Sequence, residues 1–284
     1  MLDFVHSVTF FFAQWDFNDP LALLACFAST TYIAGILRLR LKSRRFPFAF
    51  RQMGAAIGGF FFLILALAGP FDVFAYQAFW PHMIQHLLLS MVAAPLLLIS
   101  NPMPVFLWTL PQLLREGAGE LLRPSGQIQK ILRLIIRPQV TLPFYILILY
   151  AWHVPDLFTM AINNSLVHYL QHFTFFLSAM LFWWPIIGPA PLRSKLNYPQ
   201  RLLYIVLAIT PTALIAAIIT LSTGVIYDHY LSTSRHWQIS ALEDQTIAGI
   251  IMWIPGNLVY LTSLTIIFFS WANKEDKRAI TARK

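Results

Sequence analysis

Two pairs of histidines have the spacing at which side chains can bind one metal ion together. His82 and His86 are four residues apart, and so are His168 and His172. Residues four apart lie on one face of a helix, so the two imidazoles of each pair should point the same way. Neutral imidazole is a ligand for copper, zinc, iron and nickel. The spacing therefore predicts two helix-borne pairs of metal ligands.

A fifth histidine and one carboxylate are expected at the same depth as these pairs. Pro81 at an early helical position and Ser165 as an N-cap would each start a helix close to a histidine pair. His153 ends an apolar run just before Pro155, and Asp244 opens the last apolar run. The alternative is that these histidines only hydrogen-bond to lipid headgroups or to one another. The candidate metal ligands are His82, His86, His153, His168, His172 and Asp244.

For the remaining histidines and for two methionines, a role other than metal binding is the preferred interpretation. His6, His229 and His236 lie outside the apolar runs, where ordinary hydrogen bonding is the preferred interpretation and transient metal capture the alternative. Met83 adjoins the first histidine pair, and Met252 lies two helical turns beyond Asp244. Thioether sulfur favours Cu(I), but methionine in a membrane helix usually fills space, so packing is expected for both.

The elements that must position these residues are membrane helices. Of the 284 residues 58% are hydrophobic and 11% are charged, whereas soluble domains carry about 25% charged residues. About 20 apolar residues span a bilayer as a helix, and barrel strands would be shorter and alternate with polar residues. We therefore predict an all-α integral membrane protein, a single domain over residues 1–284 with about seven transmembrane helices. The expected spans are 20–37, 52–70, 81–100, 139–154, 165–187, 199–223 and 245–271, of which the fourth is short enough to require a kink or snorkelling of Arg137.

The basic residues predict how this bundle is oriented. When the connections are assigned alternately to the two sides, all of the 20 Lys and Arg residues except Arg235 fall on one side. The positive-inside rule then places the N-terminus outside and the C-terminus in the cytoplasm. All eight histidines fall on the outer side. The net charge of +8 is therefore a topology signal, and membrane lipid rather than nucleic acid is the expected partner.

The segment 101–137 is not predicted to cross the membrane. Pro102, Pro104 and Pro111 interrupt its apolar first part. In 112–137 leucine and isoleucine recur at helical spacing among basic residues, which is typical of helices that lie on a membrane surface. We expect such helices on the cytoplasmic surface, and a solvated loop with some helix is the alternative.

The N-terminal region and the cysteine content carry no processing or redox signal. Met1–Pro20 lacks a basic start and contains Asp3, Asp16 and Asp19, so a signal peptide is not expected. The one cysteine, Cys26, lies in an apolar run, cannot form an intrachain disulfide, and is expected to pack.

Four segments, in their order and spacing, resemble the multi-spanning, CtaG-type cytochrome c oxidase assembly factors. The likeness covers about residues 70–270. The segments are His82-Met-Ile-Gln-His86, Trp152-His153-Val-Pro155, the run from His168-Tyr-Leu-Gln-His172 to Phe182-Trp-Trp-Pro-Ile-Ile-Gly188, and Glu243-Asp-Gln-Thr-Ile-Ala-Gly249 leading to Met252-Trp253.

This resemblance implies a multi-pass protein of the bacterial plasma (inner) membrane that helps to assemble a haem-copper oxidase and has no catalytic turnover. Oxidase subunits would be its partners and copper its metal. His82, His86, His153, His168, His172 and Asp244 would handle the ion. One departure is Gln171, which stands where the resemblance leads us to expect an acidic residue and so removes a possible carboxylate ligand.

Other functions stay open on the sequence alone. Histidine pairs facing each other from the third and fifth spans could hold a bis-histidine haem b for electron transfer. The chain could equally be a metal-free scaffold for oxidase subunits. A diiron oxygenase is disfavoured, because the sequence has no adjacent His-His motif and few carboxylates near the histidines.

Overall fold

The computed structural model is all-helical in the part of the chain that it describes, with no strand there. This agrees with the predicted fold class. Of the residues discussed above, Asp3, His6, Arg235 and His236 lie outside the described residues. The described residues are 9–11, 13–42, 49–121, 123, 126–233 and 238–282.

Six helical segments in the described residues are long and apolar enough to cross a membrane, and a bent pair of helices gives a possible seventh. This agrees with the prediction of about seven spans. The six are α2 (Pro20–Lys42), α3 with α4 (Phe50–Ala68 and Pro70–Ala75), α5 with η1 and α6 (Phe79–Leu87, Leu88–Ala93 and Ala94–Ile99), α12 (Ser165–Ile187), α13 (Tyr198–Leu221) and α14 (Ala241–Ala282).

The seventh is the span that the sequence predicts to be short. Helix α10 (Pro138–His153) has 16 residues, which at 1.5 Å per residue gives about 24 Å, less than the bilayer core of about 30 Å. It is bent by 55° from the preceding α9 (Gln127–Ile135). Because Pro155 starts a separate helix, α11 (Pro155–Asn163), α10 ends at His153.

The segment between α6 and α10 folds into helices, as predicted for 112–137. They are α7 (Pro102–Thr109), α8 (Gln112–Leu121) and α9. Leu113 is 82% exposed and Ile131 56% exposed, so α8 and α9 leave apolar side chains uncovered by the bundle. A membrane surface would cover such side chains, and that contact stays a prediction.

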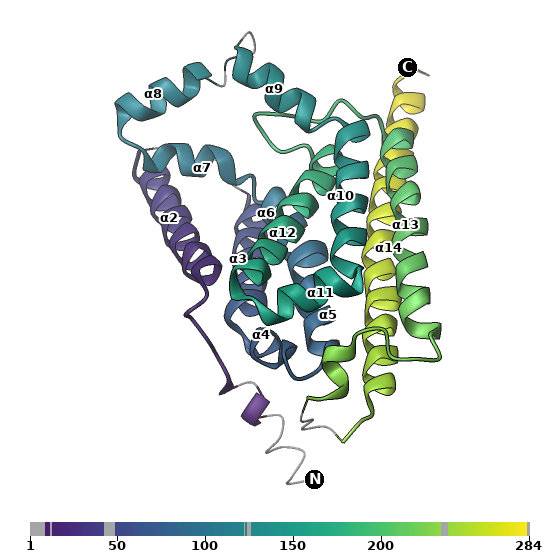
Figure 1. Cartoon of the computed structure of the whole chain (residues 1–284). Coiled ribbons are helices and arrows are strands. Elements are labelled where there is room, and N and C mark those ends of the chain that lie inside the picture. Colours follow the sequence, from purple (N-terminus) through teal and green to yellow (C-terminus); the bar gives the residue numbers. More distant parts are fainter. Residues whose placement is uncertain are drawn as a thin grey trace.

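The bundle has two distinct ends (Figure 1). One end carries α8, α9 and the C-terminus of α14. The other carries α4, α11 and the start of α5, and we call it the histidine end. The helix termini that are rich in Lys and Arg, including the end of α2 and the tail of α14, lie opposite the histidine end. The side of the membrane that each end faces stays a prediction.

The helix that carries the first histidine pair widens into a π-helical segment just after it. The Ala94 N–H bonds to the Leu89 carbonyl, five residues back. Pro95 explains this local geometry, because it has no N–H to donate to the Met91 carbonyl and its ring crowds the preceding turn. π-Helical turns inside α-helices occur frequently at functional sites.

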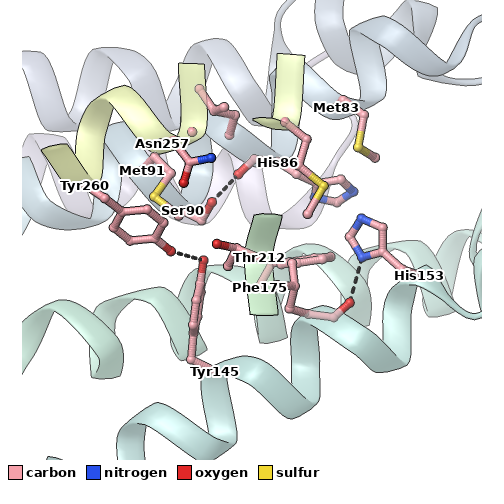
Figure 2. A pocket seen from close by; sticks show the side chains of 14 residues that line it. Met83, His86, Ser90, Met91, Tyr145, His153, Phe175, Thr212, Asn257 and Tyr260 are labelled. Carbon is pink, nitrogen blue, oxygen red and sulfur yellow. Dashed lines mark hydrogen bonds between the residues drawn. The ribbon is translucent and has the colours of Figure 1, made fainter. Parts of the chain in front are cut away.

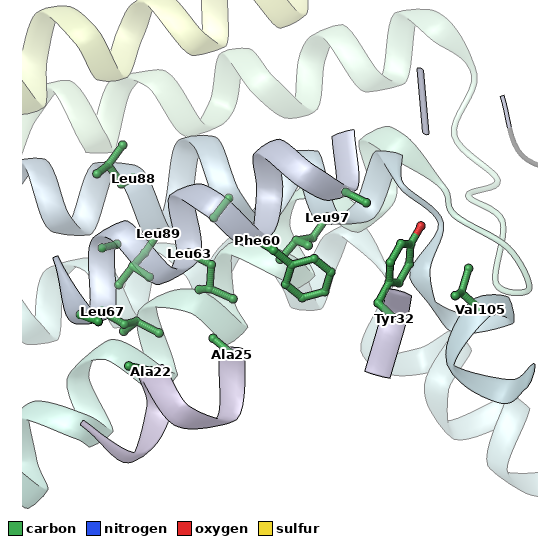
Figure 3. Packing of buried hydrophobic residues seen from close by; sticks show 14 of the residues in the cluster. Ala22, Ala25, Tyr32, Phe60, Leu63, Leu67, Leu88, Leu89, Leu97 and Val105 are labelled. Carbon is green, nitrogen blue, oxygen red and sulfur yellow. The ribbon is translucent and has the colours of Figure 1, made fainter. Parts of the chain in front are cut away.

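An apolar core packs α2, α3, η1 and α6 together (Figure 3). Phe60, Leu63 and Leu67 of α3 are buried against Leu89 and Leu97. These contacts hold the third span against α2 and α3.

The contact between α13 and α14 depends on Gly249. A Cβ atom there would lie 2.3 Å from Oγ1 and 2.8 Å from the backbone nitrogen of Thr220. Gly249→Ala should therefore lower the free energy of unfolding by about 1–3 kcal/mol through overpacking, measured as thermal unfolding in detergent. Gly256→Ala on the same helix is the control, because its Cβ would meet nothing closer than 3.8 Å. Equal unfolding temperatures for the two variants would contradict this packing.

Candidate metal centre

Four histidines from α5 and α12 meet inside the histidine end of the bundle. The ring centroids within each pair are 4.3 Å apart for His82 and His86 and 4.1 Å apart for His168 and His172. Between the helices, His82 lies 6.0 Å from His168, and His86 lies 5.5 Å from His172. All four side chains are buried. We call these four residues the histidine cluster.

The start of α12 differs by one residue from the sequence expectation. The N-cap is Asn164, whose Oδ1 accepts hydrogen bonds from the N–H groups of Leu166 at 3.0 Å and Val167 at 3.3 Å. Ser165, expected as the cap, is the first helical residue. The backbone of Asn164 is extended, as an N-cap requires. His168 therefore lies in the first turn of α12, close to the end of the bundle.

Most ring nitrogens of the histidine cluster have no hydrogen-bond partner among the described residues. His86 Nε2 and His82 Nε2 lie 2.6 Å apart and share one hydrogen bond. The unpartnered buried atoms are Nδ1 of His82, Nδ1 of His86, Nε2 of His168 and both nitrogens of His172. A buried polar atom without a partner costs about 1–3 kcal/mol. A metal ion would satisfy several of these atoms at once, so the donor set fits one.

A carboxylate that the sequence analysis did not select completes the cluster. One oxygen of Asp72 and one nitrogen each of His168 and His172 lie within 4.8 Å of one another. Ligands bonded tetrahedrally to one ion at 2.0–2.1 Å are about 3.4 Å apart, so small side-chain movements would close this site. Asp72 Oδ1 also accepts a 2.6 Å hydrogen bond from Gln85 Nε2, which donates to the Ala66 carbonyl as well.

Asp72 was missed because the second span was expected to end at residue 70. The chain instead breaks at Gly69 and continues as α4, with Pro70 at its start and Asp72 in its first turn. Asp72 of α4 thereby lies within hydrogen-bond distance of Gln85 of α5. A lone acidic residue directly after a membrane span is the signal that could have identified it, since such residues usually face a functional interior.

Asp244 has a different place from the one that the sequence suggests. Its Oδ2 accepts a hydrogen bond from the N–H of Phe79 at 2.8 Å, and its Oδ1 accepts one from the N–H of Trp80 at 3.0 Å. A carboxylate is stabilised at a helix N-terminus by the free N–H groups and the helix dipole. Asp244 is fully buried and caps α5 from α14, so it positions the helix that carries His82 and His86.

The side chains over the cluster come from the loops at the histidine end. The Tyr76 hydroxyl lies 3.3 Å from His168 Nδ1, and burial raises the pKa of Tyr76 to about 12, so it is a neutral hydroxyl. When Nδ1–H of His168 donates to it, the lone pair is left on Nε2. His229 donates from Nε2 to the Tyr76 carbonyl at 2.9 Å, which is the ordinary hydrogen bonding expected for this loop histidine.

His153, at the end of α10, is not part of the histidine cluster but lies next to it. Its Nδ1 donates to the Leu149 carbonyl at 2.6 Å, and its buried Nε2 has no partner among the described residues. Figure 2 shows His153 facing His86 across a small cavity. Gln171, which replaces the expected acidic residue, is buried and its Oε1 also lacks a partner there.

Comparisons with known proteins give one family. The family model described as cytochrome c oxidase caa3 assembly factor matches residues 30–274. An uncharacterized protein of Mycobacterium leprae is 23% identical over 281 residues, which cover 96% of this chain and 42% of the relative. An uncharacterized protein of Mycobacterium bovis is 24% identical over 274 residues, which cover 93% of this chain and 40% of the relative. The chain thus spans about two fifths of the curated relatives that it matches, and no solved structure matches it.

Proposed function

The chain belongs to the cytochrome c oxidase caa3 assembly factor family, and we propose that it binds copper at the histidine cluster and supplies the ion to a haem-copper oxidase. In this proposal the chain works in the plasma membrane of a bacterium, contacts oxidase subunits and lipid, and has no catalytic turnover. The histidine end faces away from the cytoplasm, because the basic helix termini lie at the opposite end.

One observation carries this proposal: Asp72, His168 and His172 each place one ligand atom within 4.8 Å of the others, and the buried rings of His82 and His86 lie next to them. Imidazole and carboxylate together suit copper or zinc, and copper is the one of these two metals that a haem-copper oxidase requires. The surrounding hydrogen bonds have the arrangement found around bound metals, in which outer partners orient the ligands. Tyr76 orients His168, and Gln85 orients Asp72.

The dimensions of the site favour an ion over haem. The two pairs approach to ring-centroid distances of 5.5 and 6.0 Å, and the cavity beside His86 has a volume of about 50 Å³. Pockets for organic ligands and cofactors measure roughly 300–1,000 Å³. A haem would therefore require α5 and α12 to separate.

Copper titration of the purified chain in detergent tests the proposal. We expect His172→Ala to weaken copper binding at the cluster by at least about tenfold, because even outer-sphere changes cost 10–100-fold in affinity. His229→Ala is the matched control: it removes a histidine at the same end whose Nε2 is bound to a carbonyl, and it should keep the wild-type affinity. A visible spectrum of the same samples reports any haem.

Two results would contradict the proposal. One is a wild-type chain that binds no copper above the level of a blank. The other is a His172→Ala chain that remains folded and keeps the full copper affinity and stoichiometry of the wild type.

A further inference from the structure

A second group of side chains of the types that bind metals lies beside the histidine cluster and includes His86. It surrounds the cavity of about 50 Å³ between α5, α10, α12, α13 and α14. Met83, His86 and His153 gather at one end of this cavity (Figure 2), and Met252 also lines it, whereas Met91 lies at the other end beside Tyr260. We call Met83, His86, His153 and Met252 the methionine pocket. Its volume suits an ion or one or two waters, because a water occupies about 30 Å³ in the liquid.

His153 presents a lone pair to the methionine pocket. Its Nδ1 proton is donated to the Leu149 carbonyl, so in the neutral ring the lone pair is on Nε2. That nitrogen is buried and has no partner among the described residues. A backbone carbonyl that holds one nitrogen while the other faces a cavity is the usual arrangement around a metal-binding histidine.

His86 belongs to both groups of residues. Its Nε2 is hydrogen-bonded to His82 in the histidine cluster, while its Nδ1 has no partner among the described residues and its ring lines the methionine pocket. The imidazole of His86 therefore lies between the histidine cluster and the methionine pocket.

The other polar side chains around the cavity already have partners. Ser90 donates to the His86 carbonyl, Thr212 donates to the Ala208 carbonyl, and the hydroxyls of Tyr145 and Tyr260 are bonded to each other. Apart from the Asn257 amide oxygen, which is buried without a described partner, the donors left for an ion are imidazole nitrogen and thioether sulfur.

We propose that the methionine pocket is a second metal site, specific for Cu(I), with the sulfurs of Met83 and Met252 and Nε2 of His153 as ligands. Thioethers are soft ligands that select Cu(I), whereas the histidine cluster with Asp72 offers only nitrogen and oxygen. The inference rests on the proposed function, because it assumes that this chain handles copper. His86 Nδ1 links the two sites, so an ion can change site by exchanging ligands and keeps its oxidation state.

Cu(I) loading of the purified chain under anaerobic, reducing conditions tests the second site. The key variant is Met83→Leu/Met252→Leu, since leucine conserves volume and such exchanges usually cost less than about 1.5 kcal/mol. Met160→Leu/Met180→Leu is the matched control, because neither of these methionines lines the cavity. The readouts are copper per chain, X-ray absorption at the copper edge, and thermal unfolding to confirm that each variant is folded.

The expected wild-type result is two copper ions per chain, one of them with sulfur neighbours. Met83→Leu/Met252→Leu should lose one ion and the sulfur signal, and His168→Ala/His172→Ala should lose the other ion and keep that signal. No sulfur neighbour in the wild type, or an unchanged signal in the leucine variant, would overturn the second site while leaving the histidine cluster intact. A wild type that binds no copper would instead overturn the proposed function itself.

Discussion

Cells whose only copy of this chain carries His168→Ala and His172→Ala should contain an oxidase with at least about tenfold less copper per haem. The double change removes both imidazoles beside Asp72. Of the histidine cluster it leaves only His82 and His86, which are hydrogen-bonded to each other. The estimate is a lower limit, because changes in outer-sphere partners alone reduce metal affinity 10–100-fold. The measurement is the ratio of copper to haem in oxidase purified from the membranes.

His229→Ala is again the control for this experiment, and immunoblots must show equal amounts of each variant. Added copper in the medium should partly restore the oxidase in the double variant, because a weakened site fills at higher ion concentration. If the double variant supports a fully copper-loaded oxidase while deletion of the chain does not, the chain acts as a scaffold and the copper proposal is wrong.

The second large effect concerns stability. Asp244→Ala should destabilise the chain by about 3–5 kcal/mol, because the buried N–H of Phe79 and the partly buried N–H of Trp80 lose a charged acceptor and each such hydrogen bond contributes about 1.5–3 kcal/mol. At 2–4 °C per kcal/mol this corresponds to a fall of roughly 10 °C in the unfolding midpoint. Asp244→Asn keeps one acceptor oxygen and should fall between wild type and Asp244→Ala. Thermal unfolding in detergent measures all three.

Glu243→Ala is the natural comparison, because it removes the neighbouring carboxylate. Glu243 is exposed, and among the described residues its carboxylate accepts hydrogen bonds from the Ser240 backbone N–H and hydroxyl at the start of α14, so its loss should lower the unfolding temperature much less than the loss of Asp244. If the Asp244→Ala and Glu243→Ala chains unfold at the same temperature, Asp244 does not hold the start of α5 as the structure indicates.

The sequence predicted the features that depend on one helix alone, namely the boundaries of most spans and which residues share a helix face. Apolar runs fixed the spans to within a few residues in most cases, because each membrane helix satisfies its own backbone hydrogen bonds. The four-residue spacing predicted that His82 lies beside His86 and His168 beside His172, since this follows from 3.6 residues per turn. The short length of the fourth span could also be predicted from the sequence, because α10 begins at Pro138 and ends just before Pro155.

The tertiary structure decided which side chains share a site. Asp72 joins the cluster because α4 continues the second span beyond Gly69 and packs against α5, while Asp244 at the same end turns its oxygens to the start of α5. His153 faces the methionine pocket rather than Asp72. The rotation of each helix about its axis follows from contacts between helices, such as that of Gly249 with Thr220, and the periodicity of one helix contains no information about those contacts.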